Sequence, residues 1–181
     1  MTYYGPKELL DSFRTVRKNT LTIANEIPAE KYSFRPAADT RSVGELLSHI
    51  ALAYSFQYQV QAVDHLKTLE GFNFPALMQR LVTEEKTPRT REQTIELLQT
   101  NGEKWAGFLQ GLTENFLAET VTMPTGSPVA SKSRFEMILS VKEHEMHHRG
   151  QLMLIERILG ITPHLTREMQ ARFAAAAAAK S

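Results

Sequence analysis

Apolar residues recur every three or four positions over four long stretches of this chain, and no other feature narrows the possible folds as much. The stretches are Lys7–Glu26, 42–69, 90–112 and 132–159, with charged side chains between the apolar ones. This period is that of an amphipathic α-helix, whereas a half-buried strand alternates apolar and polar residues. Four such helices, without convincing strand alternation, predict an all-α four-helix bundle.

Capping signals place the starts of two of these helices. Ser42 with Glu45, and Thr90 with Gln93, have the spacing of a capping box, in which each side chain accepts a hydrogen bond from the other residue's backbone. We therefore expect the second helix to begin near Ser42 and the third near Thr90. Gly71 marks the end of the second helix.

The connections between the helices are long. The segment 71–90 carries a short apolar patch between prolines, which predicts a brief helical turn, and 120–123 could be extended. The links after the first and second helices could each be crossover connections that join parallel neighbours. Spacing alone does not decide which of them cross.

Length and composition predict one domain. A chain of 181 residues with 42% hydrophobic content can fill a single core, and we assign residues 1–163 to it. Residues 164–181 form a C-terminal extension with six consecutive alanines, which predicts a short helix with a frayed end.

The charge pattern and the missing cysteines restrict the function. Lys and Arg number 21 against 20 Asp and Glu, and the basic residues are scattered among carboxylates, so we expect no nucleic-acid partner. Apolar runs long enough for a signal peptide or a membrane span are absent, which predicts a cytoplasmic protein without membrane contact. Because the chain has no cysteine, any metal ligands must offer nitrogen or oxygen.

Histidines supply the candidate chemistry. His144 and His148 are four residues apart on the predicted fourth helix, so both imidazoles face one point, while His147 lies roughly 100° around the helix from His148. His49 falls on the apolar ridge of the second helix. A lone core histidine is more often a hydrogen-bonded residue, and a bare pair is often solvated surface. Three inward-facing imidazoles are better explained by a shared divalent ion.

Other residues near these histidines have two readings each. Glu45 could orient His49, or it could simply cap the helix. Glu145 could act as a general base, although a carboxylate beside a metal ligand is often structural. The aromatic residues Tyr54, Phe56, Tyr58 and Trp105 could line a pocket, but helical spacing is also typical of plain core.

Two segments resemble the signatures of the DinB/YfiT-like superfamily. The first is Ile27–Pro36 followed by Ser42–Ile50, and the second is His144–Leu152 leading to Leu159–Pro163. The resemblance extends from about Leu9 to Pro163. It implies a four-helix bundle, usually a homodimer, with a metal held by His49, His144 and His148, and with His147 as a neighbour outside the ligand set.

The resemblance also implies a class of chemistry. Three neutral imidazoles leave a divalent ion with its full charge and an open position, which makes it a Lewis acid. Zinc or nickel fits best, and iron or manganese also suits nitrogen ligands. We therefore expect a metal-dependent enzyme acting on small molecules, either by transferring a low-molecular-weight thiol to an electrophile or by hydrolysis. The alternatives are a noncatalytic metal- or ligand-binding stress-response dimer with a structural metal, and an interaction protein with incidental histidines.

Overall fold

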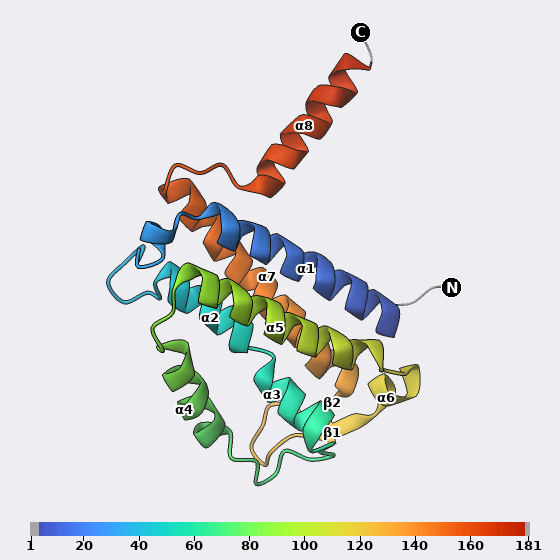
Figure 1. The fold of residues 1–181 in the computed structure, drawn as a ribbon. Helices are drawn as coiled ribbons and strands as arrows, with labels where there is room; N and C mark the ends of the chain where they lie inside the picture. The colour runs from blue at the N-terminus through green and yellow to red at the C-terminus, as the bar shows by residue number, and fades with distance from the viewer. Residues whose placement is uncertain (1–3, 180–181) are drawn as a thin grey trace.

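Four helices form the bundle in the computed structural model of the chain, which describes residues 4–179 (Figure 1). They are α1 (Pro6–Glu26), α2 (Val43–Leu52), α5 (Arg91–Gln110) and α7 (Arg134–Ile158). The remaining elements are a 3-10 helix over Ala29–Lys31, α3 (Ser55–Tyr58), a π-helix over Gln59–Val63, α4 (Phe74–Glu85), α6 (Glu114–Ala118), β1 (Thr120–Thr122), β2 (Ser131–Ser133) and α8 (His164–Ala178). The predicted all-α bundle is confirmed.

Both predicted capping boxes form. The Ser42 side chain accepts a hydrogen bond from the Glu45 backbone at 3.2 Å, and the Glu45 carboxylate accepts one from the Ser42 backbone at 2.9 Å. Thr90 and Gln93 make the same pair of bonds at 3.2 and 2.8 Å. These bonds satisfy backbone donors that a helix start leaves free, so the local sequence is sufficient to begin α2 and α5.

The predicted second helix over 42–69 is wrong in its length. α2 ends at Leu52, and the helical path continues only through α3 and the π-helix to Val63. His65 adopts a left-handed conformation with φ of 47°, which ends the helix, and the backbone of Leu69 then donates a hydrogen bond to Thr122 at 2.9 Å. Leu66 and Leu69 therefore lie in an extended segment beside β1, in which Leu69 is buried and Leu66 is partly buried. The spacing of these apolar residues could not distinguish this segment from another helical turn.

Two connections also differ from expectation. The segment 71–90 contains a twelve-residue helix, α4, where only a brief turn was predicted. The Asn73 side chain caps its start by accepting from the Ala76 backbone at 3.1 Å. The expected extended segment at 120–123 is confirmed as β1, which pairs antiparallel with β2, so the fourth helix begins at Arg134 and not at Lys132.

The hydrophobic core lies between the four bundle helices. One buried cluster around Ile23, Leu47 and Leu152 fills the half of the bundle nearest the start of α2, and a second around Phe13 and Trp105 fills the other half. Trp105 is 1% exposed, so it is core and not pocket wall. Burying side chains of this size contributes about 1.5–3 kcal/mol each, which fixes the helices that carry the histidines.

The C-terminal helix α8 extends away from the bundle (Figure 1). His164 at its start is buried, and Arg167 forms an ion pair with Glu26 of α1. The division of the chain at residue 163 remains a prediction. Within residues 4–179, no helix combines the length and hydropathy that a bilayer-spanning segment requires.

Candidate metal centre

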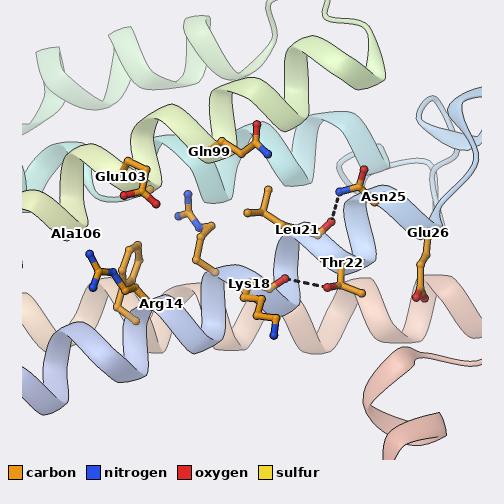
Figure 2. Close-up of a pocket in the computed structure, with 12 residues that line it drawn as sticks. Arg14, Lys18, Leu21, Thr22, Asn25, Glu26, Gln99, Glu103 and Ala106 are labelled. Carbon is orange, nitrogen blue, oxygen red and sulfur yellow. Dashed lines mark hydrogen bonds between the residues drawn. The ribbon is translucent and has the colours of Figure 1, made fainter.

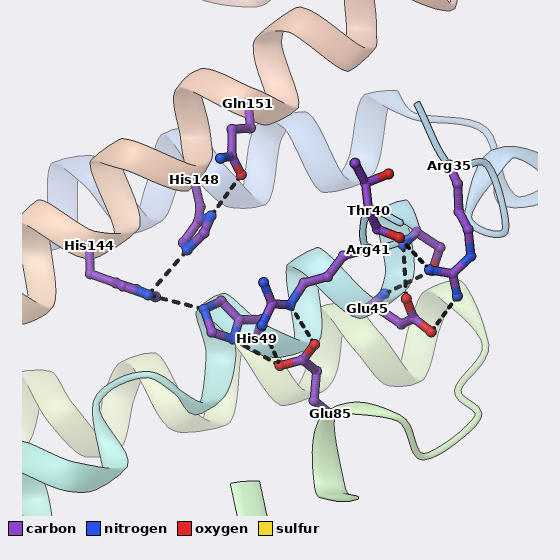
Figure 3. A network of polar contacts seen from close by, with 10 residues as sticks. Arg35, Thr40, Arg41, Glu45, His49, Glu85, His144, His148 and Gln151 are labelled. Carbon is purple, nitrogen blue, oxygen red and sulfur yellow. Dashed lines mark hydrogen bonds and ion pairs between the residues drawn. The ribbon is translucent and has the colours of Figure 1, made fainter. Parts of the chain in front are cut away.

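Three imidazoles from two helices converge in the bundle (Figure 3). His49 lies on α2, and His144 and His148 lie one turn apart on α7. His144 Nε2 is 3.0 Å from His49 Nε2 and 3.1 Å from His148 Nε2. The candidate ligand atoms of the three residues all lie within 4.8 Å of one another. The three residues predicted from the sequence are thus brought together by the fold.

The hydrogen bonds on the outer side of the rings assign their protons. His49 Nδ1 contacts the Glu85 carboxylate at 2.8 Å, and His148 Nδ1 contacts Gln151 Oε1 at 2.8 Å. Both partners are acceptors, so each Nδ1 carries the proton and each Nε2 presents a lone pair. His144 Nε2 could donate to only one of them, and the buried His144 Nδ1 has no partner among the described residues.

This arrangement fits a divalent cation. Two nitrogens bound tetrahedrally at the usual zinc–nitrogen distance lie about 3.3 Å apart, close to the separations of His144 Nε2 from the Nε2 atoms of His49 and His148. A cation at the centre would accept three lone pairs that otherwise face one another, and His144 could then carry its proton on Nδ1. The donor set is all nitrogen, which suits zinc and nickel.

The environment keeps the two candidate imidazoles of α7 neutral. Burial lowers the pKa of His144 to about 4, with further lowering by the neighbouring histidines and Arg41. Burial also lowers the pKa of His148, and this outweighs the opposite effect of its hydrogen bond to Gln151. Neutral imidazole is the form that ligates a metal, so both rings are ready to bind at neutral pH.

Glu85 at the end of α4 is the residue that the sequence analysis missed. Its carboxylate accepts from His49 and also from Nε and Nη2 of Arg41, the latter at 3.3 Å. Burial opposes ionisation of Glu85, but the bonds from His49 and Arg41 prevail, and its pKa is lowered. The carboxylate therefore holds the His49 ring in position. Glu85 lies 36 residues from His49, so no local spacing could have identified it.

Glu45 and His147 take the less functional of their predicted readings. Glu45 caps α2 and pairs with Arg35 at 2.6 Å, and the carboxylate on His49 is that of Glu85. His147 is exposed, and its Nε2 contacts the Gln151 amide nitrogen at 3.2 Å. Its ring also packs edge to face against the His148 ring with centroids 4.9 Å apart, so it lies beside the centre as a neighbour of one candidate ligand.

Glu145 is engaged elsewhere. Its carboxylate is 1% exposed and accepts three hydrogen bonds from Arg17 of α1, at 2.9, 3.1 and 2.9 Å. A buried carboxylate held in this way is a structural ion pair between α1 and α7. The general-base role expected of Glu145 remains a prediction, and this pairing weighs against it.

Two neighbouring cavities adjoin the histidines and share Arg41, Val82 and Glu85 in their walls. A mainly apolar pocket of about 290 Å³ is lined by His49, His144 and Phe56, among others. A larger groove of about 850 Å³ adjoins His148 and has Arg35, Arg41 and Lys86 on its rim. The groove between α1 and α5, of about 870 Å³ and lined by residues such as Arg14, Lys18 and Glu103, touches none of the three histidines (Figure 2).

The fold and the site together define a helical-bundle protein with a three-histidine centre. Residues 12–152 match the sequence model of the DinB superfamily, and the chain belongs to that superfamily. The family resemblance seen in the sequence is confirmed.

Relatives of known structure share this architecture. The chain is 26% identical to the uncharacterized protein YjoA of Bacillus subtilis over 157 residues, which cover 86% of this chain and 91% of YjoA. The crystal structure of YjoA superposes with a TM-score of 0.63 at 22% identity over 86% of this chain and 93% of that one. YfiT of Bacillus subtilis, described as a probable metal-dependent hydrolase with an unusual four-helix bundle topology, reaches 0.67 at 11% identity over 90% and 91% of the two chains.

One structural neighbour was solved with DNA. The colibactin self-resistance protein ClbS, in complex with double-stranded DNA, has a TM-score of 0.60 at 15% identity and covers 87% of this chain and 98% of its own. Likeness at this identity shows the fold alone. The absence of a nucleic-acid partner therefore remains a prediction from the sequence.

Proposed function

We propose that this chain is a metal-dependent enzyme of small-molecule chemistry, with His49, His144 and His148 as the ligands of a divalent ion. The observation that carries the proposal is the meeting of three imidazoles from two helices, with His144 Nε2 3.0 Å from His49 Nε2 and 3.1 Å from His148 Nε2. Zinc or nickel is the proposed metal, and iron or manganese would also fit the nitrogen donors.

A divalent cation bound there supplies Lewis acidity, which can activate a water or a thiol or polarise a carbonyl group. The chain's own residues prepare the site for it. Glu85 and Gln151 each accept a hydrogen bond from Nδ1–H of a candidate ligand histidine, which directs the Nε2 lone pair inward. The apolar pocket beside His49 and His144 limits water around the reacting groups, which strengthens electrostatic interactions there.

Hydrolysis is the first candidate reaction, and the description of YfiT as a probable metal-dependent hydrolase supports it. The second candidate is transfer of a low-molecular-weight thiol to an electrophile. The two separate cavities favour this second reaction, because one adjoins His49 and His144 and the other adjoins His148, as a reaction between two small molecules requires. A homodimer and a cytoplasmic location accompany the proposal as expectations from the sequence.

Metal analysis tests the proposal. Untagged wild-type protein should hold about one divalent ion per chain, and His49→Ala, His144→Ala and His148→Ala should each lose it. His147→Ala is the matched control, because His147 lies on the same helix but is exposed, and it should keep the metal. Full metal content in any of the three ligand variants would remove that residue from the centre.

Activity and fold separate the enzyme from the alternative. Metal-loaded protein is assayed against a panel of esters and amides and, separately, for conjugation of thiols to electrophiles. Circular dichroism before and after chelation then reports the structural effect of the metal. Collapse of the fold on chelation, with no turnover in either assay, would support the noncatalytic alternative in which the ion only joins α2 to α7.

A further inference from the structure

One face of α4 forms much of the wall of the apolar pocket beside His49 and His144. Four of its apolar side chains line this pocket: Phe74, Met78, Leu81 and Val82. Phe74 is 46% exposed and Val82 is 37% exposed, and Leu77 is the buried apolar residue of this helix. The apolar face of α4 is therefore only partly used in packing, and it leaves a cavity open next to the candidate ligands.

The size of the pocket restricts its occupant. Ligand pockets in proteins usually measure about 300–1,000 Å³, and this one, at about 290 Å³, lies at the lower end. Across from α4 the walls are Leu52, Phe56 and Val141, and the Phe56 and Phe74 rings pack edge to face with centroids 5.3 Å apart. A compact aliphatic or aryl group would fit, whereas a polymer or a large cofactor would not.

Arg41 gives the pocket one directed polar donor. Its Nε and Nη2 are both held by the Glu85 carboxylate, so the guanidinium cannot turn freely. Its Nη1 has no partner among the described residues, and Figure 3 shows this nitrogen on the side of the group away from Glu85. Arg41 lines both the apolar pocket and the neighbouring groove, so an N–H of a fixed cation is available beside the three histidines.

We infer that this site takes a small molecule with a compact apolar body and a carboxylate, the body lying against α4 and a carboxylate oxygen accepting a hydrogen bond from Arg41 Nη1. The inference rests on the proposed function and deepens it by naming the substrate class. A carboxylate is favoured over a phosphate because a single free guanidinium nitrogen can serve one of its oxygens, whereas a phosphate group presents three oxygens that need donors.

The test is calorimetric titration of zinc-loaded protein with 4-phenylbutyrate and with its neutral analogue 4-phenylbutan-1-ol. The acid should bind at least about tenfold more tightly, as expected for a hydrogen bond to a charged group. Met78→Trp, which fills the pocket, should weaken both probes. Equal affinity for the two probes, or unchanged affinities in Met78→Trp, would overturn the inference.

A single variant separates Arg41 from the metal as the source of the preference. Arg41→Gln removes the cation, and the Glu85 carboxylate keeps its hydrogen bond from His49, so it is not left unpaired beside the metal centre. At one zinc per chain, this variant should lose the preference for the acid while binding of the alcohol persists. Arg35→Gln is the control, because Arg35 lines only the neighbouring groove and pairs with Glu45. A preference that survives in zinc-loaded Arg41→Gln belongs to the metal and refutes the role given to Arg41.

The same samples distinguish this inference from the proposed function. Protein that holds one zinc per chain but binds neither probe refutes the substrate class and leaves the metal centre intact. Protein that never takes up zinc but binds the acid through Arg41 refutes the metal-dependent enzyme and leaves the pocket assignment standing.

Discussion

Replacing Glu85 by glutamine should weaken metal binding without disturbing the fold. Glu85 is not one of the proposed metal ligands. It acts through His49, because its carboxylate accepts a hydrogen bond from the Nδ1–H of that ring at 2.8 Å. The glutamine keeps the shape of the side chain but removes the charge that fixes the His49 ring and strengthens its lone pair. Loss of such a partner typically lowers metal affinity about 10- to 100-fold, which corresponds to about 1.4–2.7 kcal/mol.

That energy has a measurable thermal consequence. Zinc stabilises the fold because it binds the folded protein. When free zinc exceeds the dissociation constants of both wild type and Glu85→Gln, this stabilisation differs between them by RT times the logarithm of the ratio of their zinc affinities. For a chain of this length, 1 kcal/mol shifts the melting temperature by roughly 2–4 °C. The rise in melting temperature on adding zinc should therefore be about 3–11 °C smaller in Glu85→Gln than in the wild type.

The assay compares each protein with and without zinc, so that effects of the substitution on the metal-free fold cancel. A chelator competition measures the affinity ratio directly. Glu84→Gln is the matched control: it removes the same charge one residue earlier, from a side chain that is 49% exposed and pairs with Arg89, away from the histidines. An equal zinc increment in wild type and Glu85→Gln would refute the claim that Glu85 orients His49.

Three further results are expected from pH and packing. In the metal-free protein the pKa of His144 is about 4, against 6.5 in the unfolded chain, so the unfolded chain binds more protons between these pH values. The free energy of unfolding should therefore fall as pH drops from 6.5 to 4, and it should fall less steeply in His144→Gln. Urea titrations that give wild type and variant the same pH dependence would contradict this. Glu156 is fully buried with no partner for either carboxylate oxygen among the described residues, and burial, with the neighbouring carboxylate of α1, raises its pKa to about 7. The folded protein therefore holds a proton on Glu156 that the unfolded chain releases above pH 4.5, and stability is lost as pH rises through 7. Relative to wild type, Glu156→Gln should raise the free energy of unfolding by about 1–3 kcal/mol at pH 8 but by little at pH 4.5. A gain that does not depend on pH would contradict this. Finally, Gly102→Ala would place a methyl group 3.0 Å from the buried Arg17 side chain and should lower the free energy of unfolding by about 1–2 kcal/mol. Gly107→Ala meets nothing within 4 Å and should raise that free energy by up to about 1 kcal/mol. Chemical denaturation that gives both changes the same sign would show that the Arg17 side chain shifts at no cost.

Local patterns in the sequence were reliable where the physics is local. The capping boxes at Ser42 and Thr90 formed as expected, because each depends on two side chains three residues apart and on the backbone between them. The four-residue spacing of His144 and His148 placed both rings on one face of α7 for the same reason. The same reasoning failed over 64–69, where the buried Leu69 belongs to an extended segment that pairs with β1, more than fifty residues later.

The partners of the candidate centre could not be predicted in this way. Glu85 lies on a helix that was expected to be a brief turn, and Glu45, one turn before His49, was the only nearby carboxylate that spacing could suggest. Likewise, the position of Glu145 on α7 is visible in the sequence, but its ion pair with Arg17 joins residues 128 positions apart. Such pairings depend on how the helices pack. From the sequence alone, any carboxylate that packing brings near His49 or Arg17 could have been the partner.

The sequence by itself determined that the chain folds as helices, that two histidines share a face of one of them, and that a third points inward from another. Periodicity and capping depend on residues that are neighbours along the chain, so they can be recognised without knowing the tertiary structure. Only the tertiary structure decided that the three rings meet, that Glu85 and Gln151 orient two of them, and that α4 leaves an apolar pocket beside them. These outcomes require helices distant in sequence to approach within hydrogen-bond range, and that approach is set by the packing of the whole core.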